Sequence, residues 1–199
     1  MPSPVRRFVV HFPAGMGLDI PNLSSCTRRR LLARGARGCP ASAQVGHGHA
    51  LTEEHAGALI LTEDVALRAF LGPLREGRPT LEILGQGYSP LEERLVFTGT
   101  LRFDRAPYGE ELALRVPSIS TLPFGPHAST VTFSLTIGAS TPAAASRGHR
   151  SSRRGRRPSR EANTVIVPSR CPAAGFPFAA EFAYEDGSTG STLATARCP

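Results

Sequence analysis

The amino-acid sequence predicts a mainly β protein: an antiparallel β-sandwich of Ig-like or jelly-roll-like type, with an open barrel as the alternative. Three observations predict this class. Short stretches of alternating apolar and polar residues recur along the chain. The 20 glycines and 18 prolines tend to fall between these stretches. Only one short segment has a clear helical pattern. The 199 residues suffice for a single domain with its own core, and we expect it to comprise residues 1–138 and 164–199.

The N-terminal half contains the expected helix and the first strands. Val5–Phe12 is β-branched and aromatic, which predicts a strand. Arg28–Ala33 is suited to one or two helical turns. Gln44–Thr52 predicts a strand that its glycines weaken. Thr62–Leu71 fits both helical and strand periods, and its length and β-rich surroundings favour a strand.

The C-terminal half contains the clearest strand, Ser129–Ile137, in which Val131, Phe133, Leu135 and Ile137 alternate with polar residues. Phe176–Tyr184 and Ser188–Arg197 predict a hairpin about Asp186-Gly187, which would place Cys198 opposite Gly175. Further strands are expected at Thr80–Leu84, Leu91–Phe103, Leu112–Val116 and Thr164–Val167.

The positive charge is concentrated in one tract. The chain has 23 Lys+Arg, 16 Asp+Glu and a net charge of +7. Seven arginines and no acids lie between residues 147 and 160, so the rest of the chain is neutral. Because the surrounding segment has little apolar surface, we expect residues 139–163 to form a disordered loop. It offers a polyanion or cell-surface contact through Arg147, Arg150, Arg153, Arg154, Arg156, Arg157 and Arg160.

The four cysteines fall into two local pairs, one near each end of the chain. Cys26 and Cys39 flank the expected helix, and Cys171 and Cys198 flank the C-terminal hairpin. We expect a disulfide in each pair, worth about 3 kcal/mol; four reduced thiols are the alternative. Disulfides indicate an extracytoplasmic or secreted protein. Because no export signal follows Met1, we expect the true N-terminus to have been lost. No apolar run is long enough for a membrane span.

No catalytic signature or cofactor motif is present, so we expect neither catalytic residues nor a cofactor. His47, His49 and His55 form the one histidine cluster, with Glu53 and Glu54 beside them. Because no third ligand has diagnostic spacing, we expect exposed strand histidines and no metal. Adjacent carboxylates at 53–54, 92–93 and 110–111 are expected to point to opposite faces of their strands.

Three segments carry a resemblance: H-F-P-A-G-M-G at residues 11–17, C-P-A-S-A-Q-V-G at 39–46 and R-C-P-A-A-G-F-P-F-A-A-E-F at 170–182. Together they resemble uncharacterised, exported β-rich proteins of GC-rich bacteria, a group without an assigned activity. The resemblance implies export and disulfides, and it supplies no catalytic residues.

These observations leave three functional hypotheses. The favoured one is a non-enzymatic extracytoplasmic β protein with a structural or binding role and an unknown partner. The second is polyanion or nucleic-acid binding through the arginine tract, which would weaken steeply with salt. The third is a carbohydrate-active hydrolase, which would require a concave cleft with two close carboxylates.

Overall fold

The computed structural model describes residues 3–20, 23–56, 59–88, 93–119, 127–138 and 165–198. The described chain is mainly β, as predicted, and nine of its strands form one antiparallel sheet. Thr62–Leu71 lies in a strand, which confirms the choice made for that segment. The nine strands are β1 (Val5–Pro13), β3 (Gln44–Ala56), β4 (Leu59–Leu71), β5 (Thr80–Gly87), β6 (Arg94–Phe103), β7 (Tyr108–Arg115), β8 (Ser129–Ile137), β10 (Phe176–Tyr184) and β11 (Thr189–Ala196).

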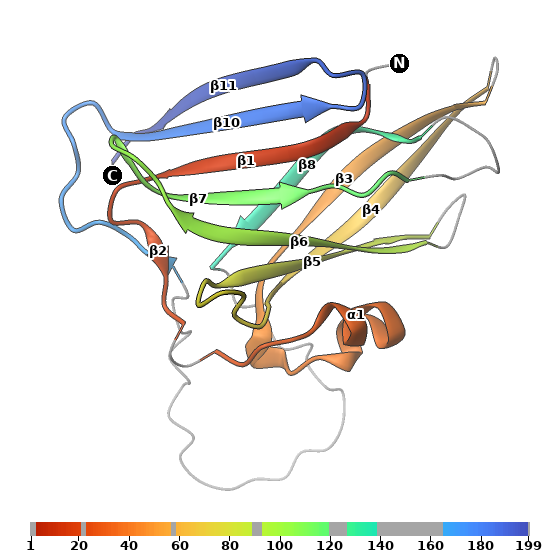
Figure 1. The fold of residues 1–199 in the computed structure, drawn as a ribbon, viewed down its shortest axis with the longest axis horizontal. Coiled ribbons are helices and arrows are strands. Elements are labelled where there is room, and N and C mark those ends of the chain that lie inside the picture. The colour runs from red at the N-terminus through yellow and green to blue at the C-terminus, as the bar shows by residue number, and fades with distance from the viewer. Residues whose placement is uncertain are drawn as a thin grey trace, which may run out of the picture.

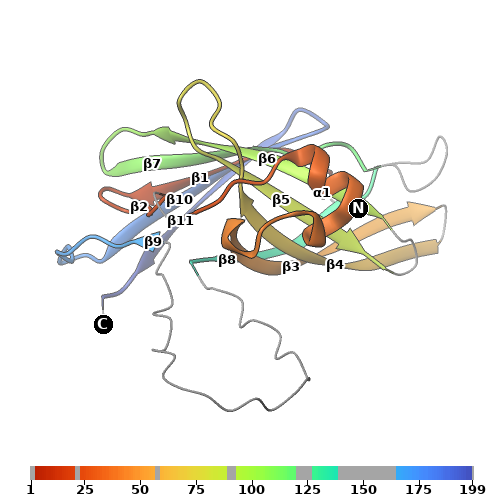
Figure 2. The same cartoon turned by 90° about the horizontal axis from the view of Figure 1, so that it is seen from below.

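The sheet has the strand order β11-β10-β1-β7-β6-β5-β4-β3-β8. Strands β3 to β7 follow one another as a meander, whereas β1 lies between β7 and β10. The sheet curls into a half-barrel, so that its edge strand β8 passes behind β1 and β7 (Figures 1 and 2). Phe8 on β1 and Phe133 on β8 meet across the inside of this curve, with ring centroids 5.9 Å apart.

The single curled sheet corresponds to the open-barrel alternative and differs from the two stacked sheets that we expected. A period-two pattern shows which residues of a strand share a face. It does not show whether that face meets a second sheet or another part of its own sheet, and both arrangements bury the same residues. Strands β8 and β10, which come late in the chain, make the difference between a sandwich and a single curled sheet. They do not form a second sheet, because β8 is one end of the main sheet and β10 lies next to its other end.

The helical segment lies against the outer, convex side of the sheet, beside β5 and β6 (Figure 1). Helix α1 (Arg28–Arg34) begins where the Thr27 hydroxyl accepts a hydrogen bond from the Arg30 N–H, and it ends at Gly35, whose φ is 59°. The short helices η1 (Gly35–Gly38) and η2 (Ala41–Ala43) lead from it into β3. Among the described residues, no helix is both long enough and apolar enough to cross a membrane.

Each side of the sheet has its own apolar cluster. On β5, Leu81 and Ile83 belong to the concave-side cluster, and Leu84 belongs to the convex-side cluster beneath α1. Alternate residues of a strand point to opposite faces, so one strand supplies both clusters. The convex cluster consists of Cys26, Leu31, Ala43, Phe70, Leu84 and Val96, all fully or almost fully buried.

Both expected disulfides are present. Cys26 is bonded to Cys39 and Cys171 to Cys198, with Cα–Cα distances of 5.5 and 6.2 Å. The β10–β11 hairpin differs from its expected register by one residue, because Ala183 pairs with Thr189 and Phe176 with Ala196. The reason is a three-residue loop closed by Gly187, whose φ of 85° suits glycine, where we expected a two-residue turn.

Two smaller strands complete the described structure. Strand β2 (Gly17–Leu18) pairs with β9 (Val165–Ile166) outside the main sheet. The expected Thr164–Val167 strand is therefore shorter than predicted. The arginine tract at residues 139–163, predicted to be disordered, lies outside the described residues, as do its seven arginines.

Candidate functional site

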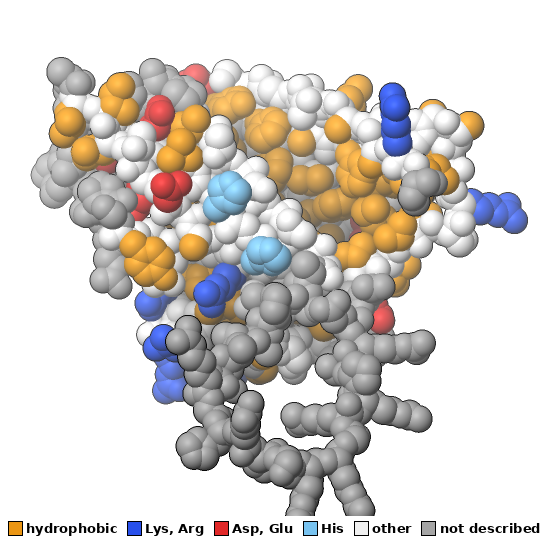
Figure 3. Space-filling view, turned by 180° about the vertical axis from the view of Figure 1, so that it is seen from behind, with side chains coloured by type: hydrophobic (Ala, Val, Ile, Leu, Met, Phe, Trp, Pro, Cys, Tyr) orange, Lys and Arg blue, Asp and Glu red, His pale blue; other side chains and the backbone are white. Residues whose placement is uncertain are grey.

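The concave side of the half-barrel is an apolar hollow. Seen from behind, the molecule has a depression in which hydrophobic side chains gather (Figure 3). Two cavities occupy this hollow, with volumes of about 470 and 500 Å³. Phe8, Leu114 and Phe133 line both, so the Phe8–Phe133 contact stands between them. Each volume falls within the usual range for small-molecule sites.

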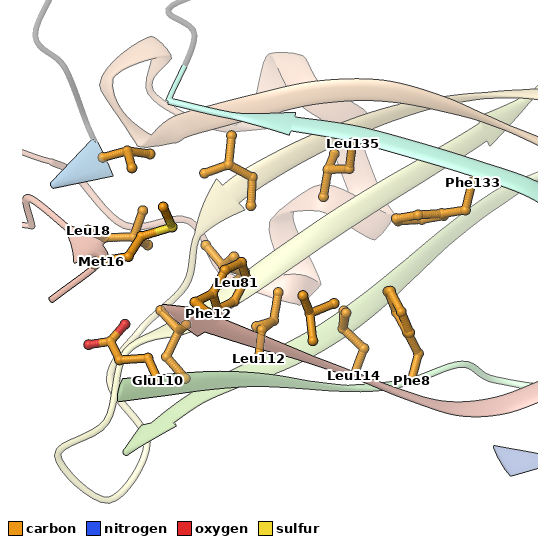
Figure 4. A pocket seen from close by; sticks show the side chains of 15 residues that line it. Phe8, Phe12, Met16, Leu18, Leu81, Glu110, Leu112, Leu114, Phe133 and Leu135 are labelled. Atoms are coloured by element: carbon orange, nitrogen blue, oxygen red, sulfur yellow. The ribbon is translucent and has the colours of Figure 1, made fainter. Parts of the chain in front are cut away.

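The first cavity is lined almost entirely by hydrocarbon side chains (Figure 4). Its only ionisable lining residue among those described is Glu110. The other lining residues are Phe8, Val10, Phe12, Met16, Gly17, Leu18, Leu81, Leu101, Leu112, Leu114, Phe133, Leu135, Ile137 and Val165. The second cavity is also mainly apolar, with hydroxyl groups at its margins from Ser3, Thr52, Thr130, Thr132 and Tyr184.

The alternation of β1 and β7 explains this lining. On β1, residues 8, 10 and 12 face the hollow, and on β7 residues 110, 112 and 114 do so. Aromatic rings of β10 extend the apolar wall. Phe8 stacks on Phe182 with ring centroids 5.1 Å apart, and Phe12 meets Phe178 edge to face at 6.3 Å. Such pairs stabilise adjacent strands beyond the area they bury.

Glu110 lies at one end of the first cavity, close to Met16 and Leu18 (Figure 4). Burial raises the pKa of its carboxyl group, because water no longer fully solvates the charged form. Gly17 lies next to this group, and a Cβ atom there would be in ordinary van der Waals contact, 3.6 Å from the nearer Glu110 oxygen. Because Glu110 lines the cavity, a bound molecule could contact its carboxyl group with a hydrogen-bond donor.

The close approach of β3 and β8 depends on Gly48, one of the glycines that make β3 a weak strand prediction from sequence. A Cβ atom on Gly48 would overlap the carbonyl oxygen of Ser134 on β8. The glycine therefore allows β8 to close over this edge of the hollow. The neighbouring His47 and His49 are exposed and face the other way, as expected for solvent-facing strand histidines. The side chain of His55 lies outside the described residues.

A cluster of titratable groups that the sequence did not reveal lies on the convex side of β1, β6 and β7. The Nδ1 atom of His11 is 2.6 Å from the Asp104 carboxylate, and its Nε2 atom is 3.7 Å from Glu181. One ligand atom each from His11, Asp104 and Glu111 lie within 4.8 Å of one another. Imidazole and carboxylate groups at these distances could hold a divalent cation.

Hydrogen bonding controls the charge of Asp104. Burial favours a higher pKa, but hydrogen bonds from His11 and from the Arg105 backbone N–H outweigh it and hold the pKa of Asp104 below its usual value. Asp104 is therefore a carboxylate at neutral pH and accepts a hydrogen bond from the Nδ1–H of His11. No sequence signal could have linked the two residues, which are 93 positions apart.

The hydrolase hypothesis required two close carboxylates in a concave cleft. The described linings of the two cavities contain one carboxylate, Glu110. Its sequence neighbour Glu111 is on the opposite face of β7, as expected for adjacent strand residues. The hollow therefore has the chemistry of a binding site for an apolar molecule rather than of a carboxylate pair.

Comparisons with known proteins leave this chain without an established relative. No family model, no curated protein and no solved structure matches it. The resemblance to exported β-rich bacterial proteins therefore stays a prediction.

Proposed function

We propose that this protein is a non-enzymatic, extracytoplasmic binding protein that holds an elongated amphiphile in the hollow of its half-barrel. The observation that carries the proposal is an apolar cavity of about 470 Å³ with a single carboxyl group at one end. Burying a hydrocarbon chain there is favourable by about 25 cal/mol per Å² of apolar surface. The two disulfides are compatible with the extracytoplasmic location.

The carboxyl group of Glu110 favours one kind of ligand head group over another. A carboxyl group with a raised pKa in apolar surroundings gains most from a partner that donates a hydrogen bond or carries positive charge. A long-chain amine or alcohol supplies such a group, whereas a fatty acid presents a second carboxylate. We therefore expect the site to prefer donor head groups over anionic ones.

A matched pair of tryptophan substitutions tests the site. Leu135 on β8 lines the first cavity, whereas Leu193 on β11 is 78% exposed and lines neither cavity. We expect Leu135→Trp to fill the cavity and weaken binding of the neutral fluorescent probe phenylnaphthylamine by about tenfold, equivalent to about 1.4 kcal/mol. Leu193→Trp should bind the probe as the wild type does. Equal binding by both variants, or no binding by the wild type, would contradict the proposal.

Head-group preference is tested by displacing the same probe with dodecylamine, dodecanol and dodecanoate. The amine and alcohol should displace it at lower concentration than the acid. Glu110→Gln should reduce the advantage of the amine, because the amide carries no negative charge. An unchanged order of the three ligands in this variant would show that Glu110 does not contact the head group.

A further inference from the structure

The convex side of the sheet contains a groove lined by five arginines. Its volume is about 520 Å³, and we call it the arginine groove. The guanidinium groups come from five separate elements: β1, α1, the loop after β4, β6 and β7. They belong to Arg7, Arg28, Arg75, Arg102 and Arg115, and Thr98 and Thr100 lie between them. No acidic residue is among the described lining residues.

These arginines are not neutralised by neighbouring side chains. Within the described part of the chain, none of the five side chains forms a hydrogen bond, and the ion pairs shorter than 4.0 Å involve histidines instead. Arg102 is opposite Glu111 in the β6–β7 register without forming such a pair. Arg7 and Arg115 are direct cross-strand partners, and like charges in that position are destabilising.

Among the described residues, the acid whose pKa Arg75 and Arg28 lower is enclosed. Glu82 is fully buried and accepts a hydrogen bond from the Thr98 hydroxyl at 2.7 Å. Burial raises the pKa of Glu82, while Thr98, Arg75 and Arg28 act in the opposite direction. A buried carboxyl group of this kind offsets little of the charge of five exposed guanidinium groups. The groove therefore presents a positive potential to solvent.

Rigid local structures present two of the arginines. Arg28 begins helix α1, which the Cys26–Cys39 disulfide and buried Leu31 fix to the sheet. Arg75 begins a tight turn in which its backbone exchanges two 2.9 Å hydrogen bonds with Arg78. The two central residues of this turn both have positive φ, the geometry of a type I′ turn. The backbone that carries these two side chains is thus fixed beside the sheet arginines, so that binding would have to order the side chains alone.

We propose that the arginine groove binds a phosphorylated ligand that carries at least two negative charges. The planar fork of a guanidinium group matches phosphate oxygens, and several forks can share one polyphosphate. The volume exceeds the needs of a single ion and suits a di- or polyphosphate compound. A bound anion would also relieve the repulsion between Arg7 and Arg115. The groove and the apolar hollow lie on opposite sides of the sheet, so this inference does not depend on the proposed amphiphile.

The test is calorimetric titration of the full chain with inorganic pyrophosphate. The double variant Arg7→Gln/Arg115→Gln should weaken binding by about tenfold or more, since it removes two charged hydrogen-bond donors, each of which contributes about a factor of ten to binding. Arg37→Gln/Arg68→Gln is the matched control, because it removes the same charge from exposed positions that do not line the groove. Pyrophosphate should raise the melting temperature of the wild type and the control, but not that of the groove variant.

Unfolding of the Arg7→Gln/Arg115→Gln variant would not explain the expected loss of pyrophosphate binding. Replacing Arg7 and Arg115 removes a like-charge pair, so the free variant should melt at or above the wild-type temperature. A third variant replaces the seven arginines between residues 147 and 160 by glutamine. If pyrophosphate binding survives in the groove variant and disappears in this third variant, the tract is the anion site and the proposal is overturned.

A second arm distinguishes a free phosphate compound from a lipid phosphate. Vesicles of phosphatidylcholine with and without cardiolipin, a lipid with two phosphate groups, are sedimented with the wild type, the groove variant and the control. Groove-dependent binding to pyrophosphate alone identifies a free phosphate compound as the ligand class. Groove-dependent binding to the anionic vesicles identifies a lipid phosphate. If neither probe binds, or if the groove variant binds both as well as the wild type, the proposal is wrong.

Discussion

The two sides of the curled sheet are built from the same alternating strands, yet they have different roles. On the convex side α1 covers the apolar cluster, and Phe70 is only 1% exposed. On the concave side Phe133 remains 41% exposed at the rim of two cavities. The apolar pattern alone therefore does not distinguish Phe70 from Phe133. What distinguishes these two positions is how fully neighbouring segments of the described chain cover the side chain.

The largest expected effect compares one phenylalanine from each side. Phe70→Ala should lower the free energy of unfolding by about 3–5 kcal/mol, because it leaves a cavity beneath α1. Phe133→Ala should have a smaller effect on stability, because solvent already reaches this side chain, and it should weaken binding in the hollow. Urea denaturation and probe titration of both variants measure the two effects. Similar losses of stability would show that Phe133 is packed as tightly as Phe70.

The disulfides provide a second comparison of the same kind. The chain-entropy model assigns about 3 kcal/mol to the Cys26–Cys39 bond and slightly more to Cys171–Cys198, whose loop is longer. Cys26 is also fully buried in the convex cluster, so removing it disturbs packing. We therefore expect Cys26→Ala/Cys39→Ala to destabilise the protein more than Cys171→Ala/Cys198→Ala. The reverse order, measured by thermal unfolding, would mean that loop length outweighs burial here.

Replacing Glu110 should have a smaller effect on stability, and the effect should depend on pH. Since burial raises its pKa in the folded protein, its ionised form opposes folding at neutral pH. This penalty is absent below the usual value of 4.5 and develops as the pH rises through the folded-state pKa. Glu110→Gln should therefore stabilise the free protein at neutral pH and have little effect at low pH. Because the group is only partly buried, we expect a gain below about 1 kcal/mol.

The matched control for this prediction is Glu76→Gln, at an exposed position in the turn between β4 and β5 that lines neither cavity. It removes the same charge without changing the hollow, so any gain common to both variants reflects net charge alone. A Glu110→Gln variant whose stability follows the wild type at every pH would show that the cavity leaves its carboxyl group well solvated.

Local features were predictable from the sequence, whereas the closure of the sheet was not. The alternation in Ser129–Ile137, the Arg28–Ala33 helix and both cysteine pairs depend on neighbouring residues, and each has its expected structure. The curl depends on pairing β1 with β7 and β10, which lie about half a chain and nearly a whole chain away. Alternation does not encode such distant partners.

The candidate sites show the same division. Glu110 could have been placed beside the apolar face, because it alternates with Leu112 and Leu114, whereas we expected only that Glu110 and Glu111 would point to opposite faces of their strand. The arginine groove could not have been found, since its five arginines are scattered between residues 7 and 115. The predicted basic tract, by contrast, was obvious in sequence and lies outside the described residues.

The smallest expected effect concerns the His11–Asp104 pair on the convex side. Hydrogen bonds lower the pKa of Asp104, so this carboxylate contributes stability that is present above 3.8, the usual value, and is lost as the pH falls through the folded-state pKa. Asp104→Asn should therefore flatten the loss of stability in that acidic range. At neutral pH it should cost only about 0.5 kcal/mol, the lower end for a single hydrogen bond, because the amide oxygen can still accept from His11. Thermal unfolding across the acidic range measures both effects. If the variant loses stability with falling pH as steeply as the wild type, other carboxylates dominate acid unfolding. The hydrogen-bonded Glu185, whose pKa Ser118 and His127 lower, would then be the next residue to replace.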